Sequence, residues 1–564
     1  MRSSRREFFG TFGTGAAALT LGARGASAGP AAAATPAAAK AKDEAPVLQI
    51  GEEVAVASTQ HGKVRGYVLR GVHRFLGIPY GADTSGASRF LPAQKPKPWT
   101  SVLPAVWWGN SAPQDMERRY ANAYVSFRDH WNYDDVSEDC LRVNVFTPAL
   151  GDGKKRPVLF WIHGGGFTAG NGIEQDGYDG ENFARFGDVV FCSINHRLGP
   201  LGYCHLAGVG GERFAASGNV GNLDIVLALE WVRDNIAAFG GDAGNVTIMG
   251  QSGGGAKVCA LAAMPSAKGL FHKAVVLSGA ALRMGEKATA EKLGAYVVEE
   301  AGLTPAQIDK LQYLSWKEYL AVANRAQQRL GRELGPGGGL RRGFNPVVDG
   351  VVLPQDPYYP AAAPSGADVP MLICSTFNEQ SPSWIDPALE NVTLAEVAEK
   401  VKLRAGFGPG FGDKAKDVVD SYAKAFPGKR PIEIWSLVSS NRQSAVALAD
   451  AKSKQPAPVY IAWFGWQPPL FDGRARAFHC LDICFWFHNT DLMLSHTGGG
   501  SRPRALADKM AGALLRFMKS GDPSAPGLAW PRYTSANGET MVLDDVCAVR
   551  NDPDREARKA LPAV

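Results

Sequence analysis

The chain of 564 residues has little net charge, no internal repeat and no sustained stripe of Lys and Arg. Its formal net charge is +5. The first 28 residues hold four arginines against one glutamate, so removing them takes away +3 and leaves +2. Such a chain offers no basic field to a nucleic acid, and we expect no nucleic-acid partner. With 45% hydrophobic and 20% charged residues, the composition is typical of a globular protein.

After the N-terminus the chain also lacks any run apolar enough to span a membrane. Residues 4–9 (SRREFF) form a twin-arginine pattern, and residues 26–28 (ASA) form a small-x-small cleavage signal. The stretch between them is shorter and richer in glycine than the ~20 apolar residues of a membrane span. We therefore expect residues 1–28 to be a signal peptide read by the twin-arginine export machinery. The mature protein would be periplasmic or secreted from a bacterium, with no stable membrane anchor.

The eight cysteines contain no CxxC pair of the spacing that holds a metal. Cys192, Cys259 and Cys374 lie inside apolar runs, where cysteine usually packs as a small buried hydrophobe. A twin-arginine substrate normally folds before it leaves the reducing cytoplasm, although export would permit disulfides. We expect most of the eight to be free thiols.

A serine between glycines follows a short apolar run at residues 245–258 (NVTIMGQSGGGAKV). The run Val246–Met249 predicts a buried strand and Ala256–Met264 a helix, so residues 250–254 (GQSGG) fit the G-x-S-x-G elbow. Such an elbow presents the hydroxyl of Ser252 on a strained turn, with a helix N-terminus directed at nearby negative charge. A phosphate-binding loop is excluded, because no Gly-Lys-Ser/Thr follows. A structural turn with an idle serine remains open on this stretch alone.

A second glycine run, His163-Gly164-Gly165-Gly166-Phe167, follows the predicted strand at residues 158–162. Consecutive glycines let backbone N–H groups face a cavity with no Cβ in the way. Acyl transfer needs such donors where the carbonyl oxygen becomes negative, and each can contribute ~3 kcal/mol. A strand with HGGG upstream of a strand with G-x-S-x-G is far more specific than either motif alone.

A serine nucleophile needs a histidine base and a carboxylate that orients it. In α/β-hydrolases the chain order is serine, acid, histidine. His479 follows the predicted strand at residues 459–464 and a turn-rich loop, whereas His272 lies on the wrong side of the predicted sheet. Glu379 follows the predicted strand at residues 371–375. Asp482, three residues after His479, is the rival acid, but we expect it to fix the local backbone or make a supporting contact.

Apolar strand patterns alternate with helical ones from about residue 155 onward. This alternation predicts a large, mostly parallel central sheet flanked by helices, with helical insertions at residues 280–345 and 385–450. Together with the two glycine motifs, this arrangement is typical of an α/β-hydrolase fold. We assign residues 29–46 to an Ala/Pro-rich linker, 47–550 to the catalytic domain and 551–564 to a C-terminal tail. The site is expected at the carboxyl ends of the strands.

On these motifs, the chain resembles the type-B carboxylesterase and cholinesterase family over nearly all of residues 50–550. Further matching stretches are FLGIPYG (75–81), SEDCLRVNVFTP (137–148), SINHRLGPLGY (193–203), GNVGNLD (218–224) and NIAAFGGDAGNVTIMGQSGGG (235–255). The resemblance implies the nucleophile Ser252, the acid Glu379 and the base His479. It also implies an oxyanion hole from the backbone N–H groups of Gly165, Gly166 and Gly253.

The same resemblance implies that Ser278 supports the acid and that Arg89 pairs with Glu138. The sequence departs from the family in two places. Cys140 matches a family cysteine that often forms a disulfide, but its expected partner region, residues 111–116, has no cysteine. Gln251 stands where cholinesterases carry glutamate, so a cationic choline ester is not indicated. Residues 116–136 form an aromatic-rich loop that either walls the entrance or simply packs.

The sequence thus predicts an exported serine hydrolase that cleaves a small-molecule carboxylic ester through an acyl-enzyme. It needs no metal and no organic cofactor. Cleavage of an amide or carbamate by the same triad is the nearest alternative, because these reactions differ in leaving-group protonation and pocket shape. A non-catalytic, cholinesterase-like binding protein is the alternative from another class, and the intact set of serine, acid, histidine and glycines argues against it.

Overall fold

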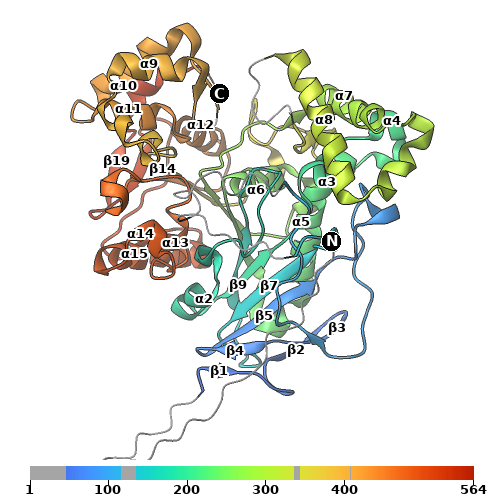
Figure 1. Ribbon diagram of the computed structural model, residues 1–564. Coiled ribbons are helices and arrows are strands. Elements are labelled where there is room, and N and C mark those ends of the chain that lie inside the picture. The colour runs from blue at the N-terminus through green and yellow to red at the C-terminus, as the bar shows by residue number, and fades with distance from the viewer. Residues whose placement is uncertain (1–45, 116–126, 128–134, 336–342, 407, 564) are drawn as a thin grey trace, which may run out of the picture. The chain divides into compact units, whose positions relative to one another are not determined.

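A sheet of twelve strands runs through the unit that begins at Val47 (Figure 1). The computed structural model describes residues 46–115, 127, 135–335, 343–406 and 408–563. The strand order is β1 (Leu48–Gln49), β4 (Tyr67–Leu69), β5 (Val72–Pro79), β7 (Arg142–Thr147), β9 (Val190–Ile194), β8 (Arg156–Ile162), β10 (Gly241–Gln251), β11 (Lys273–Leu277), β14 (Met371–Thr376), β17 (Val459–Phe464), β18 (Glu539–Leu543) and β19 (Ala548–Asn551). Neighbours from β9 to β18 are parallel, and those outside them are antiparallel. The prediction of a mostly parallel sheet is confirmed.

The central strands are apolar throughout because both of their faces are buried. In β8, Val158, Phe160 and Ile162 belong to one core cluster, whereas Leu159 and Trp161 belong to the other. The first cluster lies beneath α5 (Val220–Asn235), α6 (Gly253–Ala263) and α12 (Arg442–Lys452). The second lies beneath α2 (Glu181–Gly187), α13 (Ile483–Trp486) and α15 (Ser501–Ser520). The period of two along each strand thus produces a sheet covered on both faces.

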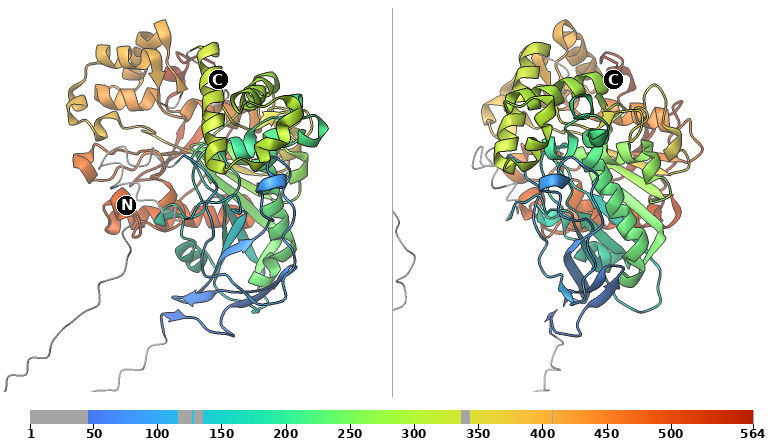
Figure 2. Two further views of the ribbon diagram at one scale, coloured as in Figure 1. Left: turned by 45° about the vertical axis from the view of Figure 1, so that its right-hand side comes forward. Right: turned by 90° about the vertical axis from the view of Figure 1, so that its right-hand side faces the viewer.

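Two helical groups interrupt the alternation of strands and helices, as predicted, and Figure 1 and the left view of Figure 2 show them apart from one another. One holds α7 (Lys287–Glu300) and α8 (Trp316–Leu334), and the other holds α9 (Leu394–Leu403), α10 (Ala415–Ala425) and α11 (Pro431–Val438). The second group has its own small core. Residues 551–564, assigned to a tail, contribute α16 (Arg555–Arg558), which packs on α10, and Asp554 there is buried beside Arg442.

The register of the parallel strands aligns their carboxyl ends. Gly250 of β10 pairs with Ile162 of β8, and Leu277 of β11 pairs both with Gln251 of β10 and with Cys374 of β14. The loops that follow these strands therefore leave the sheet at one edge. They carry the glycine run, the elbow serine and the predicted acid.

Two smaller expectations also have an outcome. Arg89 and Glu138 form a buried, two-point ion pair with N–O distances of 2.7 and 2.6 Å, which confirms the predicted pair. All eight cysteines are free, and Cys140 is fully buried.

Within the described residues, no helix has the length and apolarity to cross a membrane. The aromatic-rich loop at 116–136 lies outside the described residues except for Phe127 and residues 135–136.

Candidate active site

The predicted elbow is a sharp turn between a strand and a helix. β10 ends at Gln251 and α6 begins at Gly253, so Ser252 alone forms the corner. Its φ of 57° and ψ of −122° are a strained conformation for a residue with a Cβ, and its N–H donates to the carbonyl of Leu277 at 2.7 Å. A Cβ at Gly254 would lie 2.0 Å from the carbonyl oxygen of Ile162. The glycine therefore lets α6 press against the end of β8, and the predicted elbow geometry is confirmed.

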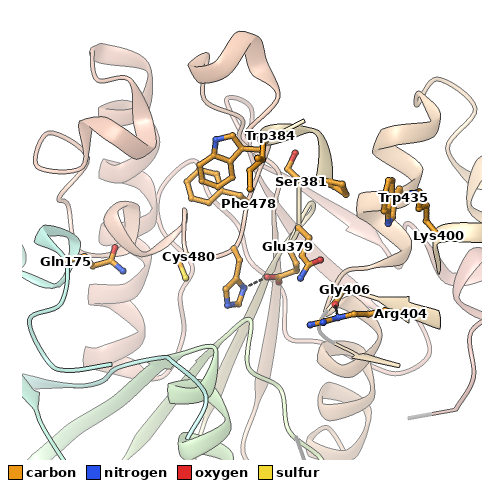
Figure 3. Close-up of a pocket in the computed structure, with 14 residues that line it drawn as sticks. Gln175, Glu379, Ser381, Trp384, Lys400, Arg404, Gly406, Trp435, Phe478 and Cys480 are labelled. Atoms are coloured by element: carbon orange, nitrogen blue, oxygen red, sulfur yellow. Dashed lines mark hydrogen bonds and ion pairs between the residues drawn. The ribbon is translucent and has the colours of Figure 1, made fainter. Parts of the chain in front are cut away.

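The predicted acid and base are joined at the same edge of the sheet. The Nδ1 atom of His479 lies 2.5 Å from Oε2 of Glu379 (Figure 3). The backbone N–H of His479 also donates to the backbone carbonyl of Glu379 at 3.1 Å. The other carboxylate oxygen accepts the N–H of Thr376 at 3.1 Å. Because the Glu379 side chain is wholly buried, these bonds fix both the carboxylate and the imidazole.

The electrostatic surroundings of His479 favour its protonated form. Burial lowers its pKa, but the Cys480 sulfur and the Glu379 carboxylate raise it, and the pKa lies well above the usual value. A positioned carboxylate at Nδ1 is what stabilises an imidazolium while it holds a proton taken from a nucleophile.

Gln251 makes a contact with the imidazole that the sequence interpretation missed. Its Nε2 lies 3.1 Å from Nε2 of His479, the ring atom opposite Glu379. No hydrogen bond joins Ser252 Oγ to His479 among the described residues. Catalytic hydrogen bonds are often long before substrate binds, so this geometry does not exclude a hydrogen bond between Ser252 and His479 in the complex with substrate. The position of Gln251, directly before the serine at the end of β10, was the available signal.

The glycine loop after β8 lies against the start of α6. Gly165 and Gly166 have φ of +82° and +64°, in the left-handed region that glycine tolerates, and a Cβ on Gly253 would lie 2.0 Å from the Gly166 carbonyl oxygen. Within the described chain, the N–H groups of Gly165, Gly166 and Gly253 have no acceptor. Three backbone donors thus remain available close to the elbow serine.

A buried lysine below this loop is a second feature that sequence reasoning missed. Lys257 of α6 is fully buried, and its Nζ donates to the His163 carbonyl at 3.2 Å. Burial lowers its pKa to about 7, and the Glu174 carboxylate opposes this shift. The stacked rings of His163 and His196 lie beside it, with centroids 4.9 Å apart. The signal was a single lysine inside the apolar stretch that follows the elbow.

The two predicted supporting residues have different surroundings. Oδ2 of Asp482 accepts the indole N–H of Trp486 at 3.2 Å, and burial followed by the charge of Glu379 raises the Asp482 pKa to about 7. The Ser278 hydroxyl is buried and makes no hydrogen bond to the described residues, so its support of the acid stays a prediction.

Among the described side chains, no group of three His, Cys, Asp or Glu could hold a metal ion.

A cavity of about 600 Å³ opens beside the acid and the base (Figure 3). It is lined by Gln175, Glu379, Gln380, Ser381, Pro382, Trp384, Ile385, Lys400, Arg404, Gly406, Trp435, Phe478, His479 and Cys480. Ser252 lies outside this lining. Most of its surface is apolar and aromatic because of Pro382, Trp384, Ile385, Trp435 and Phe478. The cavity reaches the imidazole from the side of the helical group at residues 385–450.

The mostly parallel sheet, with the glycine loop, the elbow and the Glu379 loop at its carboxyl edge, defines an α/β-hydrolase fold. The family model described as "Carboxylesterase family" matches residues 53–559. The chain is 34% identical to the para-nitrobenzyl esterase of Bacillus subtilis (strain 168), over 90% of this chain and 98% of that protein. It is 32% identical to the phenmedipham hydrolase of Pseudarthrobacter oxydans, over 87% of this chain and 95% of that protein.

A solved structure agrees with these relatives. An esterase from Clostridium hathewayi, described as able to hydrolyse aliphatic aromatic polyesters, superposes with a TM-score of 0.77 at 32% identity. The match covers 91% of this chain and 98% of that one. The chain belongs to the carboxylesterase family and is a carboxylic ester hydrolase, which confirms the resemblance, the fold and the class of enzyme inferred from the sequence.

Proposed function

We propose that Ser252, His479 and Glu379 act as nucleophile, base and acid, and that ester cleavage passes through an acyl-enzyme. The observation that carries the proposal is the contact of 2.5 Å between Glu379 and Nδ1 of His479, at the sheet edge where the elbow presents Ser252. The opposite nitrogen, Nε2, is then the atom that exchanges a proton with the serine.

The reaction follows from this arrangement in two halves. Ser252 Oγ attacks the ester carbonyl while His479 takes its proton, and the N–H groups of Gly165, Gly166 and Gly253 donate to the resulting oxyanion. Collapse of this tetrahedral species breaks the ester bond, and His479 gives its proton to the departing alcohol. Water then attacks the acyl-enzyme with the same base, which releases the carboxylic acid and restores the serine.

Replacement of the nucleophile tests the proposal. Ser252→Ala removes Oγ and should remove nearly all turnover of aryl and alkyl esters, with the unfolding temperature unchanged within a few degrees. A panel that contains matching amides and carbamates would also define which bonds the triad cleaves. A folded variant that kept a substantial part of the wild-type rate would overturn the assignment of Ser252.

We further propose that the precursor leaves the cytoplasm by the twin-arginine route. The support is the SRREFF pattern, the weakly apolar stretch after it and the ASA signal at residues 26–28. Changing both Arg5 and Arg6 to Lys should leave uncleaved precursor in the cytoplasm. If the mature protein still appeared outside the cytoplasm at the normal level, the general secretory route would be indicated instead.

A further inference from the structure

The cavity beside His479 is lined by two cations, Lys400 and Arg404. Lys400 comes from α9 and Arg404 from the short strand β15 (Arg404–Ala405), and both line the cavity together with Trp384 and Trp435. Neither cation has a described carboxylate within 4.0 Å. An aromatic wall with two positive charges is suited to a flat, anionic group.

The backbone holds the Arg404 side chain in place. Its Nε donates to the Gly406 carbonyl at 3.1 Å. Gly406 has a φ of +60°, and a Cβ there would lie 2.3 Å from the Ser439 carbonyl oxygen, so the turn requires glycine. This bond uses one of the five N–H donors, and the terminal nitrogens make no hydrogen bond to described residues. Figure 3 shows Arg404 extending from its strand toward the side of the cavity where Glu379 lies.

Five acidic side chains in or near the cavity have hydrogen-bond or ion-pair partners other than Lys400 and Arg404. Their partners are His479 for Glu379, Arg430 and Arg476 for Glu390, Thr393 for Glu396, Lys402 for Glu399 and Lys429 for Glu433. Thr393 is uncharged, so Glu396 keeps its negative charge and interacts with Lys400, one turn further along α9. Arg404, with no described carboxylate within 4.0 Å, is therefore the cation that most strongly attracts an anion in the cavity.

The chemistry of the triad indicates which part of an ester lies in this cavity. His479 must return its proton to the departing alcohol, so the alcohol part lies against the imidazole. The cavity is lined by His479 but not by Ser252 or by the oxyanion glycines. We propose that it binds the alcohol part of the ester and that Arg404, assisted by Lys400, accepts a carboxylate on that part. Esters of phenols that carry a carboxylate would then be a preferred substrate class. The inference rests on the proposed triad.

A matched pair of esters tests the anion subsite. 4-Acetoxybenzoate and 4-acetoxybenzamide differ only in the charge of the ring substituent, and the measured quantity is the ratio of their kcat/KM values. Comparing this ratio between variants cancels the intrinsic reactivity of the two esters. Arg404→Met should lower the ratio about five- to tenfold, as expected for a partly exposed charge-assisted hydrogen bond, and Arg404→Lys should lower it less.

Lys402→Met is the matched control. Lys402 lies on α9 two residues before Arg404, is exposed, pairs with Glu399 and does not line the cavity, so its loss should leave the ratio unchanged. A ratio that fell equally in the Lys402 and Arg404 variants would mean a long-range field and would overturn the subsite. A preference that followed a carboxylate on the acyl part, measured with monophenyl terephthalate and its amide, would also overturn it.

The two proposals fail in different ways. If the wild-type protein cleaves both acetoxy esters and the ratio is the same in every Arg404 variant, the subsite is wrong and the triad stands. If Ser252→Ala cleaves both esters as fast as the wild type, the proposed triad is wrong, and the subsite argued from it is wrong as well.

Discussion

At the scale of single residues, the site pairs His479 with a carboxylate on one ring nitrogen and an amide on the other. Glu379 lies 2.5 Å from Nδ1, and the Gln251 amide lies 3.1 Å from Nε2. An amide donor at Nε2 favours the neutral ring, whereas the carboxylate favours the protonated one. In the proposed mechanism the Ser252 hydroxyl must reach the same ring nitrogen, so the Gln251 amide would have to leave it.

The pH dependence of catalysis follows from the raised pKa of His479. The base must be neutral to take a proton, and its folded-state pKa lies well above the ordinary 6.5, so activity is lost as the pH falls through that raised value. The kcat/KM for a neutral aryl ester should therefore rise with pH and reach half its maximum above pH 6.5. Gln251→Glu places a second carboxylate at the ring and should move this midpoint upward by about one unit. A midpoint below 6.5, or one that Gln251→Glu leaves in place, would contradict this electrostatic account.

The two candidate acids should differ strongly in their effect on kcat. Glu379→Gln removes the carboxylate that contacts Nδ1 and should lower kcat by about 10³-fold or more. Asp482→Asn should lower it only about tenfold, because Asp482 bonds the Trp486 indole rather than the imidazole. Both values can be measured on one aryl ester. If the Asp482 substitution were the more damaging one, the role of Glu379 would be wrong.

At the scale of elements, the elbow depends on how closely α6 approaches β8. A Cβ at Gly254 would meet the Ile162 carbonyl oxygen at 2.0 Å, so Gly254→Ala must push the helix and the elbow serine away from the glycine loop. A misplacement of about 1 Å can cost about 10²-fold in rate, and we expect kcat to fall by that factor. Gly331→Ala in α8 is the control, since no atom lies within 4 Å of its Cβ position, and it should leave kcat unchanged. Equal activity of the two variants would contradict the close approach.

The elements differ in how well the sequence predicts them. The strands at 158–162, 371–375 and 459–464 agree with β8, β14 and β17 within two residues at each end, because burial on both faces makes the whole strand apolar. The helix expected from Ala256 begins at Gly253 instead, since three glycines have low helix propensity and hide its first turn. A helix held by packing against β8 and β10 does not need that propensity.

The contacts within the site were less predictable than the elements. The position of each motif after a strand predicts which loops meet, because the carboxyl ends of parallel strands share one edge. It does not predict that the Gln251 amide contacts His479 or that Lys257 holds the His163 carbonyl. Those contacts depend on side-chain conformations and on the spacing of neighbouring strands, which leave no periodic trace in the sequence.

At the scale of the whole molecule, no disulfide contributes to the fold. All eight cysteines are free, and burial raises the pKa of thiols such as Cys259 to about 12, which keeps them protonated and unreactive. Activity should survive a mild reductant, and titration of the denatured, unreduced protein should find most of the eight thiols. If most were missing, the cysteines would be paired, and the conclusion that the fold holds together without disulfides would be wrong.

The central claim is that the acyl group of the ester is transferred first to Ser252, with release of the alcohol, and then to water. The most direct test is to mix the enzyme with an excess of a slowly deacylated aryl ester, quench the reaction in acid within the first turnovers and locate the added acyl mass by peptide mass spectrometry. The account predicts the acyl group on Ser252, with a burst of phenol equal to the enzyme concentration. An acyl group on a different residue, or a folded and active enzyme with no acyl group at any time point, would contradict it.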